Sequence, residues 1–194
     1  MREFRNFVMS SAVSLLVSQA AEAGQFVVEL NKPLSVEATA GSSHYDVAVD
    51  ETLSAGVDSY AVLTAADEAA LQTFLKAFGI LPEKVSEVLF INSPEVGGGA
   101  PTGAELRSGH DVYVVERPIP GVGFLGLEKK QQISRNSNAA IAKLGEIVEW
   151  DHSYLTGEGT YCVYRADSPE TLREHGVLAG APVGKITKVV QVGG

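Results

Sequence analysis

Cysteine and tryptophan are the scarcest chemically useful residues in this sequence. Its 194 residues include one cysteine and one tryptophan. A single cysteine excludes a disulfide framework within the chain. It also excludes an iron–sulfur cluster or a four-cysteine zinc site built from one copy.

Basic residues are also in short supply. The chain has 15 Lys and Arg against 24 Asp and Glu, which gives a formal net charge of -9 and a pI near 4.9. Such a surface repels phosphate backbones, and no basic stripe offsets the repulsion. We therefore expect this acidic protein to have no nucleic-acid partner.

The sequence has no hydrophobic run long enough to cross a bilayer, so we expect no membrane partner. The nearest candidate lies in residues 1–23, where serines interrupt the apolar stretch. This segment is typical of an N-terminal helix or of a weak signal-like segment ending in Ala21-Glu22-Ala23. A cytoplasmic location is favoured over export.

Familiar catalytic signatures are missing as well. No Ser-His-Asp order is accompanied by a nucleophile elbow, and the glycine-rich stretch 121–126 matches no phosphate-binding fingerprint. With 45% hydrophobic residues, the chain is nevertheless typical of a folded globular protein.

The chain repeats itself. When it is shifted by 101 positions, residues 47–88 align without a gap on residues 148–189 and match at ten positions. Upstream, "FVVEL" at 26–30 resembles "YVVER" at 113–117 at a shift of 87. The first copy therefore lacks about fourteen residues between its first two strands.

The repeat predicts the domain organisation and the fold. We expect a degenerate repeat at 24–91, a Gly/Pro linker at 92–109 and a second repeat at 110–192. Hydrophobic patterning predicts strand, helix, strand, strand, helix, strand in the second copy, which makes the chain α+β with two ferredoxin-like repeats. The strands of the hairpin 148–166 are apolar on both faces, so we expect two four-stranded antiparallel sheets packed face to face as a pseudo-dimer of the dimeric α+β barrel type.

The reactive side chains gather in the second repeat. His152, Cys162 and His175 stand where the first repeat has Glu51, Ala61 and Phe74. Because Phe74 belongs to an apolar helix stripe, His175 should face the sheet, where the small Gly176 and Ala179 leave room for a pocket. An inward imidazole needs a hydrogen-bond partner or a metal.

Two interpretations of these three residues stay open. If they converge, imidazole and thiolate suit nickel, zinc or copper, with Tyr154 or Glu116 completing the set. Otherwise His175 is a hydrogen-bonded buried histidine, Cys162 is a small buried hydrophobe, and His152 is an ordinary strand residue. The hairpin register, which decides whether His152 and Cys162 share a face, cannot be fixed from the sequence.

The second half resembles a family of small ferredoxin-like proteins first described as nickel-binding. The resemblance rests on "YVVER" (113–117), "VEWDHSY" (148–154), "TYCVYRA" (160–166), "SPETLREHG" (168–176) and "KITKV" (185–189). It implies nickel or another divalent transition metal, held by His152, Cys162 and His175. Members of that family are typically single domains that dimerise.

Three functional hypotheses follow. The first is a non-enzymatic divalent metal (nickel-type) binding protein. The second is a small-molecule enzyme or binder of the dimeric α+β barrel type, with His175 and Tyr154 in a pocket. The third is an assembly module without a site, which would form a homo-oligomer.

Overall fold

The computed structural model describes residues 23–193. The expected N-terminal helix or signal-like segment lies outside the described residues. Within residues 23–193, no helix combines the length and apolar character needed to cross a membrane.

The first half of the chain forms four strands and two helices. In order they are β1 (Gly24–Leu30), α1 (Val36–Gly41), β2 (Val47–Ser54), β3 (Ser59–Ala65), α2 (Glu68–Ala77) and β4 (Lys84–Glu87). A short 3-10 turn, Ser42–Tyr45, follows α1. The six residues of α1 fill the place of a full helix, as the shorter first copy predicts.

The second half forms five strands and two longer helices. They are β5 (Phe90–Asn92), β6 (Asp111–Arg117), α3 (Leu127–Leu144), β7 (Val148–Leu155), β8 (Thr160–Ala166), α4 (Pro169–Ala179) and β9 (Ile186–Gly193). Helix α4 has Ser168 as its N-cap, Pro169 in its first turn and Gly180 as its C-cap. Helix α3 begins in the charged stretch 127–133, which carries no apolar stripe that would reveal a helix in the sequence.

The strands form one large antiparallel sheet, so the chain is an α+β protein. The order is β4-β1-β3-β2-β9-β6-β8-β7-β5, nine strands in all within the described part of the chain. The prediction of two separate four-stranded sheets is therefore wrong. The reason is β9, which pairs with β6 through residues 186–189 and with β2 through residues 190–193.

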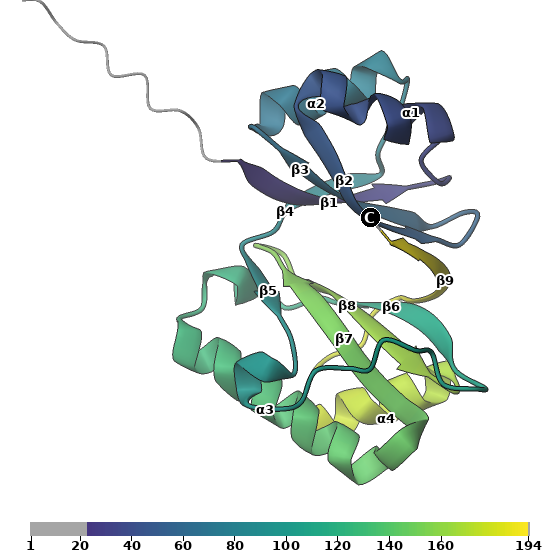
Figure 1. Cartoon of the computed structure of the whole chain (residues 1–194). Helices are drawn as coiled ribbons and strands as arrows, with labels where there is room; N and C mark the ends of the chain where they lie inside the picture. Colours follow the sequence, from purple (N-terminus) through teal and green to yellow (C-terminus); the bar gives the residue numbers. More distant parts are fainter. Residues whose placement is uncertain (1–22, 194) are drawn as a thin grey trace, which may run out of the picture.

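The sheet also returns on itself. Its end strands β4 and β5 are separated in the chain only by Val88 and Leu89. The Val88 N–H donates to Gln25 O of β1, and the Leu89 N–H donates to Leu155 O of β7, both at 2.8 Å. Residues 84–92 thus connect the first half to the second on one side, and β9 connects them on the other (Figure 1).

Four layers follow one another through the molecule: the first-half helices, the first-half part of the sheet, the second-half part of the sheet, and the second-half helices. In Figure 1, α1 and α2 cover one outer face and α3 and α4 cover the other, while the inner faces of the two halves meet. Each helix layer has its own hydrophobic core, and a third core joins inner-face residues of both halves. The buried members of this third core are Val27, Leu53, Tyr60, Val62, Val114, Tyr154, Tyr161, Val163 and Val189.

Strand pairing follows the same register in both halves. Val28 pairs with Ala61 in the first half, and Val115 pairs with Cys162 in the second. Strands β2 and β7 also have irregular pairing at the same place, around Asp50 and Asp151. All of these partners are related by the two sequence shifts, 87 for the first strand and 101 for the rest.

Reciprocal hydrogen bonds join the two inner faces. Tyr60 donates to Glu116 Oε1 of the second half at 2.7 Å, and Tyr161 donates to Glu29 Oε1 of the first half at 2.5 Å. The two tyrosines occupy equivalent strand positions, and so do the two glutamates. Each half therefore satisfies a polar group of the other within a largely apolar interface.

Tyr60→Phe and Tyr161→Phe should each lower the free energy of unfolding by about 1–2 kcal/mol, because each leaves a half-buried carboxylate without its donor. Urea unfolding monitored by circular dichroism measures the change. Arg173→Gln is the control, since it breaks an exposed ion pair with Glu170 and should cost less than about 1 kcal/mol. Tyrosine variants as stable as this control would contradict the proposed importance of the inter-half bonds.

Candidate functional site: a cavity between helices and sheet

A cavity of about 240 Å³ lies between α3, α4 and the outer face of the second-half sheet. The side chains that line it come from all of these elements and from the loops beside them. They are Asn92, Arg117, Ile119, Val122, Ile133, Asn136, Ser137, Trp150, Ser153, Leu155, Thr160, Cys162, Tyr164 and His175, with residues 179–182 completing the wall. None of them is acidic.

The equivalent place in the first half is apolar and holds a smaller pocket, of about 120 Å³, beside Leu30 and Phe78. Leu30 stands at the position of Arg117, Leu63 at that of Tyr164, and Phe74 at that of His175. These three first-half residues are buried in one hydrophobic cluster. The scaffold is therefore stable with an apolar filling, and the second half carries a polar-lined cavity in its place.

Arg117 ends β6 and is buried, with 4% of its surface exposed. Its Nη1 donates to Pro182 O at 2.8 Å, and its Nη2 lies 3.5 Å from Tyr164 Oη and 3.3 Å from His175 Nδ1. All three acceptors are neutral. Among the described residues, no carboxylate lies within 4 Å of the guanidinium.

His175 projects from α4 and is fully buried, as the comparison with Phe74 predicts. A guanidinium can only donate, so Nδ1 accepts from Arg117 and the imidazole hydrogen is on Nε2, 3.1 Å from Ser137 Oγ. Burial and the positive charge of Arg117 lower the pKa of His175 to about 4. The ring is therefore neutral near pH 7.

Aromatic side chains and the thiol form the sheet-side wall. Tyr164 stacks on Trp150 with ring centroids 6.5 Å apart, and its ring lies 5.0 Å from that of His175. Burial raises the pKa of Tyr164 to about 12, so its hydroxyl stays protonated at neutral pH. The Cys162 Sγ lies 3.0 Å from Thr160 Oγ1. The only tryptophan and the only cysteine of the chain thus share one cavity.

His152 lies on the other face of the sheet. It pairs with Val163 of the inner core, whereas Cys162 belongs to the outer core under α3 and α4. Its Nε2 is 3.2 Å from Glu51 Oε2, an atom that also accepts from Tyr154 at 2.8 Å. Burial by itself raises the pKa of Glu51, but the hydrogen bonds from His152, Tyr154 and Gln191 outweigh it and lower the pKa.

The structure thus brings Cys162 and His175 to one cavity and separates His152 from them. Tyr154, expected beside His175, also lies on the inner face. Neither residue can share an ion with the cavity pair, because the sheet lies between them. The described residues contain no group of three His, Cys, Asp or Glu side chains arranged to hold a metal ion.

The cavity does not fit a divalent cation. The Nδ1 lone pair of His175 already accepts from Arg117, and the guanidinium charge beside it repels a second cation. His152, Cys162 and His175 therefore do not form the ligand set of one ion that we expected from the sequence. The reason is the hairpin register, which the sequence left open and which places His152 on the opposite face of the sheet from Cys162.

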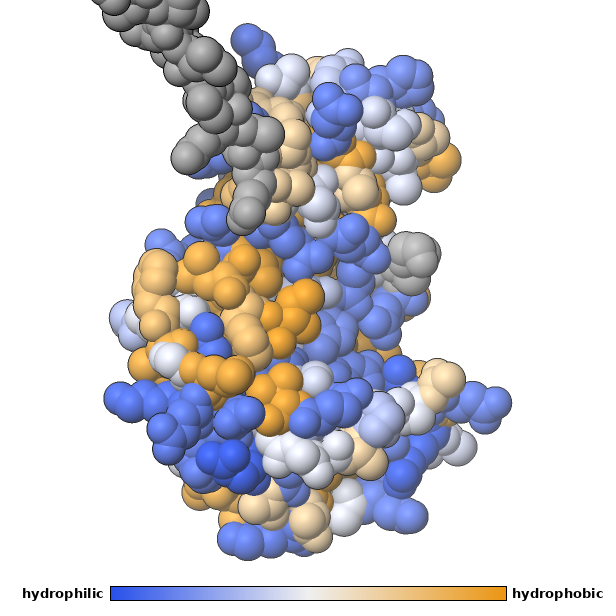
Figure 2. Space-filling view, turned by 60° about the vertical axis from the view of Figure 1, so that its left-hand side comes forward, coloured by the Kyte–Doolittle hydropathy of each residue, from blue (hydrophilic) through white to orange (hydrophobic). Residues whose placement is uncertain are grey.

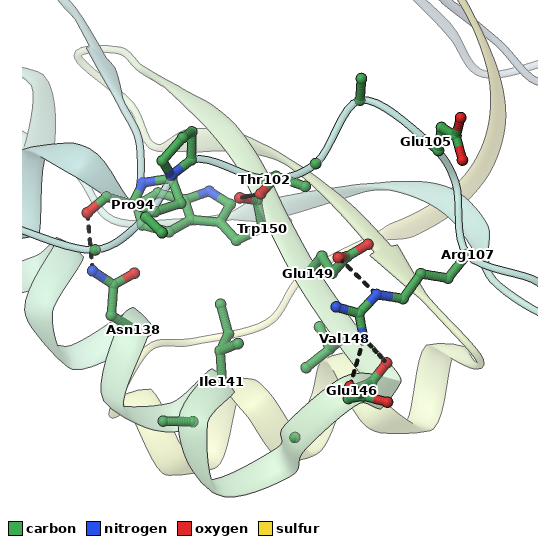
Figure 3. Close-up of a pocket in the computed structure, with 17 residues that line it drawn as sticks. Pro94, Thr102, Glu105, Arg107, Asn138, Ile141, Glu146, Val148, Glu149 and Trp150 are labelled. Atoms are coloured by element: carbon green, nitrogen blue, oxygen red, sulfur yellow. Dashed lines mark hydrogen bonds and ion pairs between the residues drawn. The ribbon is translucent and has the colours of Figure 1, made fainter.

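A larger concave surface lies nearby. This groove, about 750 Å³ in volume, runs between residues 94–107 and the surface formed by α3 and β7. Figure 3 shows Arg107 paired with Glu149 and Glu146, since Arg107 Nε lies 2.9 Å from Glu149 Oε1 and its Nη1 lies 3.7 Å from Glu146 Oε1. Asn138 and Thr102 fasten the segment through bonds to Pro94 O and Trp150 O. The expected linker is thus packed on the second half, and the paired charges make the groove the weaker candidate site.

The surface around the start of α3 is apolar. Figure 2 shows hydrophobic side chains gathered on this side of the second half. Phe124 and Leu127, just before and at the start of α3, are 74% and 58% exposed. Ile119 and Val122 of the same segment line the cavity. The segment 119–127 therefore contributes apolar groups both to the cavity wall and to the surface.

A protein-family model supports the resemblance of the second half. The family described as "Nickel responsive protein SCO4226-like" matches residues 113–189. These residues form β6 to β9, the elements that build the cavity. The comparison with curated proteins gives no match.

Several solved structures are similar over most of the chain. A variant of chlorite dismutase from Candidatus Nitrospira defluvii is 11% identical with a TM-score of 0.48, covering 90% of this chain and 94% of that chain. The same enzyme in complex with imidazole is 12% identical with a TM-score of 0.46, covering 91% and 92%. A candidate monooxygenase from Lactobacillus acidophilus NCFM is 8% identical with a TM-score of 0.38, covering 88% and 94%. At these values the similarities assign no residue or reaction to this chain.

The expected function of a non-enzymatic nickel-type binding protein is wrong. His152 lies on the opposite face of the sheet from Cys162 and His175. Arg117 donates a hydrogen bond to Nδ1 of His175, which is the ring nitrogen that could otherwise bind a metal. The alternative, a small-molecule site beside His175, is better supported, because a cavity lies there. Tyr154, the second residue expected in this pocket, lies on the inner face, and Tyr164 lines the cavity beside His175.

Sequence reasoning missed Arg117, Ser137 and Tyr164. The sequence did contain a signal for Arg117. Arg117 aligns with the apolar Leu30 of the first half, just as His175 aligns with Phe74. Tyr164 for Leu63 is a similar exchange. Ser137 gave no such signal, because it lies on α3 in the segment that the first copy lacks.

We expect the free energy of unfolding to fall as the pH is lowered from about 6.5 towards 4, by on the order of 3 kcal/mol from His175 alone. The folded-state pKa of about 4 lies below the unfolded value near 6.5, so the unfolded chain binds more protons in this window. Urea unfolding at pH 7, 5.5 and 4 measures the slope. His175→Phe should flatten it and the exposed control His44→Asn should not; equal slopes in all three proteins would contradict the assignment.

His175→Phe and Cys162→Ala should leave the nickel content of the purified chain unchanged after equilibration with Ni²⁺ and desalting. The reason is that the two side chains do not form a ligand set with His152 and lie beside a fixed positive charge. Elemental analysis measures the bound metal, with His152→Phe as a third variant. Loss of nickel in both cavity variants would show that this interpretation is wrong.

Proposed function

We propose that this chain is a small-molecule binding protein whose ligand site is the cavity between α3, α4 and the second-half sheet. The observation that carries the proposal is the cavity itself, with His175, Arg117 and Tyr164 on its wall. In the same place the first half has the apolar Phe74 and Leu30 and a pocket of only about 120 Å³, so a stable fold does not require the polar-lined cavity. Ligand sites commonly combine apolar and aromatic walls with a few placed polar groups.

The polar groups of the cavity are suited to holding a ligand in place. His175 and Tyr164 have pKa values of about 4 and about 12, and neither readily exchanges a proton near pH 7. Their hydrogen bonds to Arg117 and Ser137 fix their orientation. They therefore serve as positioning groups.

An enzyme is the second candidate function, and the Cys162 thiol on the cavity wall is the observation that favours it. In that case Cys162→Ser would abolish turnover and leave ligand affinity unchanged. The nickel in the family description is assigned to no residue of the cavity, because the donors present do not fit a cation.

We also propose that the chain is a fused pseudo-dimer of the dimeric α+β barrel type, with a degenerate first copy at 24–91 and the functional copy at 110–192. The equal strand registers support this proposal, as do the irregular pairings at Asp50 and Asp151. So do the reciprocal bonds of Tyr60 and Tyr161 across the interface. The first copy then serves as a permanent partner that covers the inner face of the second.

A panel of small aromatic fragments tests the cavity. At least one fragment should change the fluorescence of Trp150, the only tryptophan, and slow the alkylation of Cys162, the only cysteine, by iodoacetamide. Ala179→Phe introduces the residue of the first copy at this position and should abolish both effects by filling the space.

The matched control is Val177→Phe, which makes a similar change at an 82% exposed position of the same helix and should bind fragments normally. If no fragment alters either signal in the unmodified chain, or if Ala179→Phe binds as well as Val177→Phe, the cavity is not the ligand site.

A further inference from the structure

We infer that the ligand of the cavity carries a carboxylate group, which pairs with the unneutralised guanidinium of Arg117. The inference rests on the proposed function and adds the chemical class of the ligand. It depends on the balance of charge inside the cavity and on the planar groups around it.

Arg117 is the one charged residue among those lining the cavity, and no salt bridge within the described residues involves its guanidinium. Arg165, on the next strand, shows the usual arrangement: its Nε lies 3.0 Å from Asp151 Oδ2, with both side chains mostly buried. Arg117 is buried as well, yet its protein acceptors are all neutral. The chain has an excess of acidic residues, but none of those described pairs with Arg117.

A buried guanidinium is costly unless a negative charge accompanies it, because arginine cannot lose its proton in proteins. Burial disfavours the charged form of Arg117, but the nearby Tyr164 and Cys162 offset this and its pKa is raised. The positive charge therefore persists. An anion that enters the cavity supplies the missing partner and gains a charge-assisted hydrogen bond in a site of low dielectric constant.

The donors of Arg117 leave capacity for such an anion. Of its five N–H groups, three are directed at Pro182 O, Tyr164 Oη and His175 Nδ1. Two remain, the Nε–H and one Nη1–H, and each can donate a charge-assisted hydrogen bond to a carboxylate oxygen.

The remaining walls indicate the body of the ligand. Trp150 and Tyr164 present stacked rings, and Ile133 and Leu155 add aliphatic surface. A volume of about 240 Å³ corresponds to roughly eight water molecules at about 30 Å³ each. A small aromatic monocarboxylate fits this combination of size, planarity and charge.

Benzoate and its neutral isostere benzamide test the inference. Both are titrated into the full chain, with Trp150 fluorescence and Cys162 alkylation as readouts. Benzoate should bind at least tenfold more tightly than benzamide. Arg117→Leu, which introduces the residue of the first copy, should remove this preference, and Arg117→Lys should retain part of it.

Arg173→Leu is the matched control, because it makes the same substitution at an exposed arginine of α4 and should keep the preference. The comparison of benzoate with benzamide in the unmodified chain needs no variant, so misfolding of Arg117→Leu does not affect it. Circular dichroism and thermal unfolding establish the fold of each variant.

Equal binding of benzoate and benzamide, or an unchanged preference in folded Arg117→Leu, would overturn the carboxylate inference and leave the cavity as a site for neutral ligands. Absence of any response to benzoate, benzamide and the fragment panel would overturn the proposed function together with the inference.

Discussion

Two segments, β9 and residues 84–92, each bond to both halves, and this pairing is the constraint on which the rest of the structure depends. β9 bonds to β6 and then to β2, and residues 84–92 bond to β1 and then to β7. This arrangement leaves no long exposed edge, which is where sheets otherwise aggregate. It also fixes the faces: inner faces bury one another, and the outer faces are left for the helices. A ligand site that avoids the inter-half core must therefore lie under the helices.

The inner interface shows what two similar halves within one chain permit. Glu51 and His152 occupy equivalent positions, 101 residues apart, and they contact each other. In a symmetric dimer this contact would join two identical residues, and two carboxylates there would repel. A single chain can place an acid opposite an imidazole and add Tyr154 as a further donor. His152 is thus explained by the interface, without a functional ligand.

The outer face of the second half shows the opposite tendency. Its apolar counterpart buries Leu30 and Phe74 in a hydrophobic cluster, whereas Arg117 and His175 bring desolvation cost and line a larger cavity. Features that break local packing rules without a structural gain concentrate at functional sites. The stability that they cost is supplied by the remaining cores and by the inter-half tyrosine bonds. The cavity and its unneutralised cation are therefore best understood as features retained for binding.

The sequence alone determined the α+β class, the order of the elements apart from β5, and the inward position of His175, because hydrophobic periodicity is a local property. It could not determine that β9 crosses between halves, because strand pairing beyond a half depends on distant segments. The irregular pairing at Asp151 sets which face His152 occupies, and a one-residue change of register reverses that face. Only the tertiary structure could therefore separate His152 from Cys162 and bring Arg117 to His175.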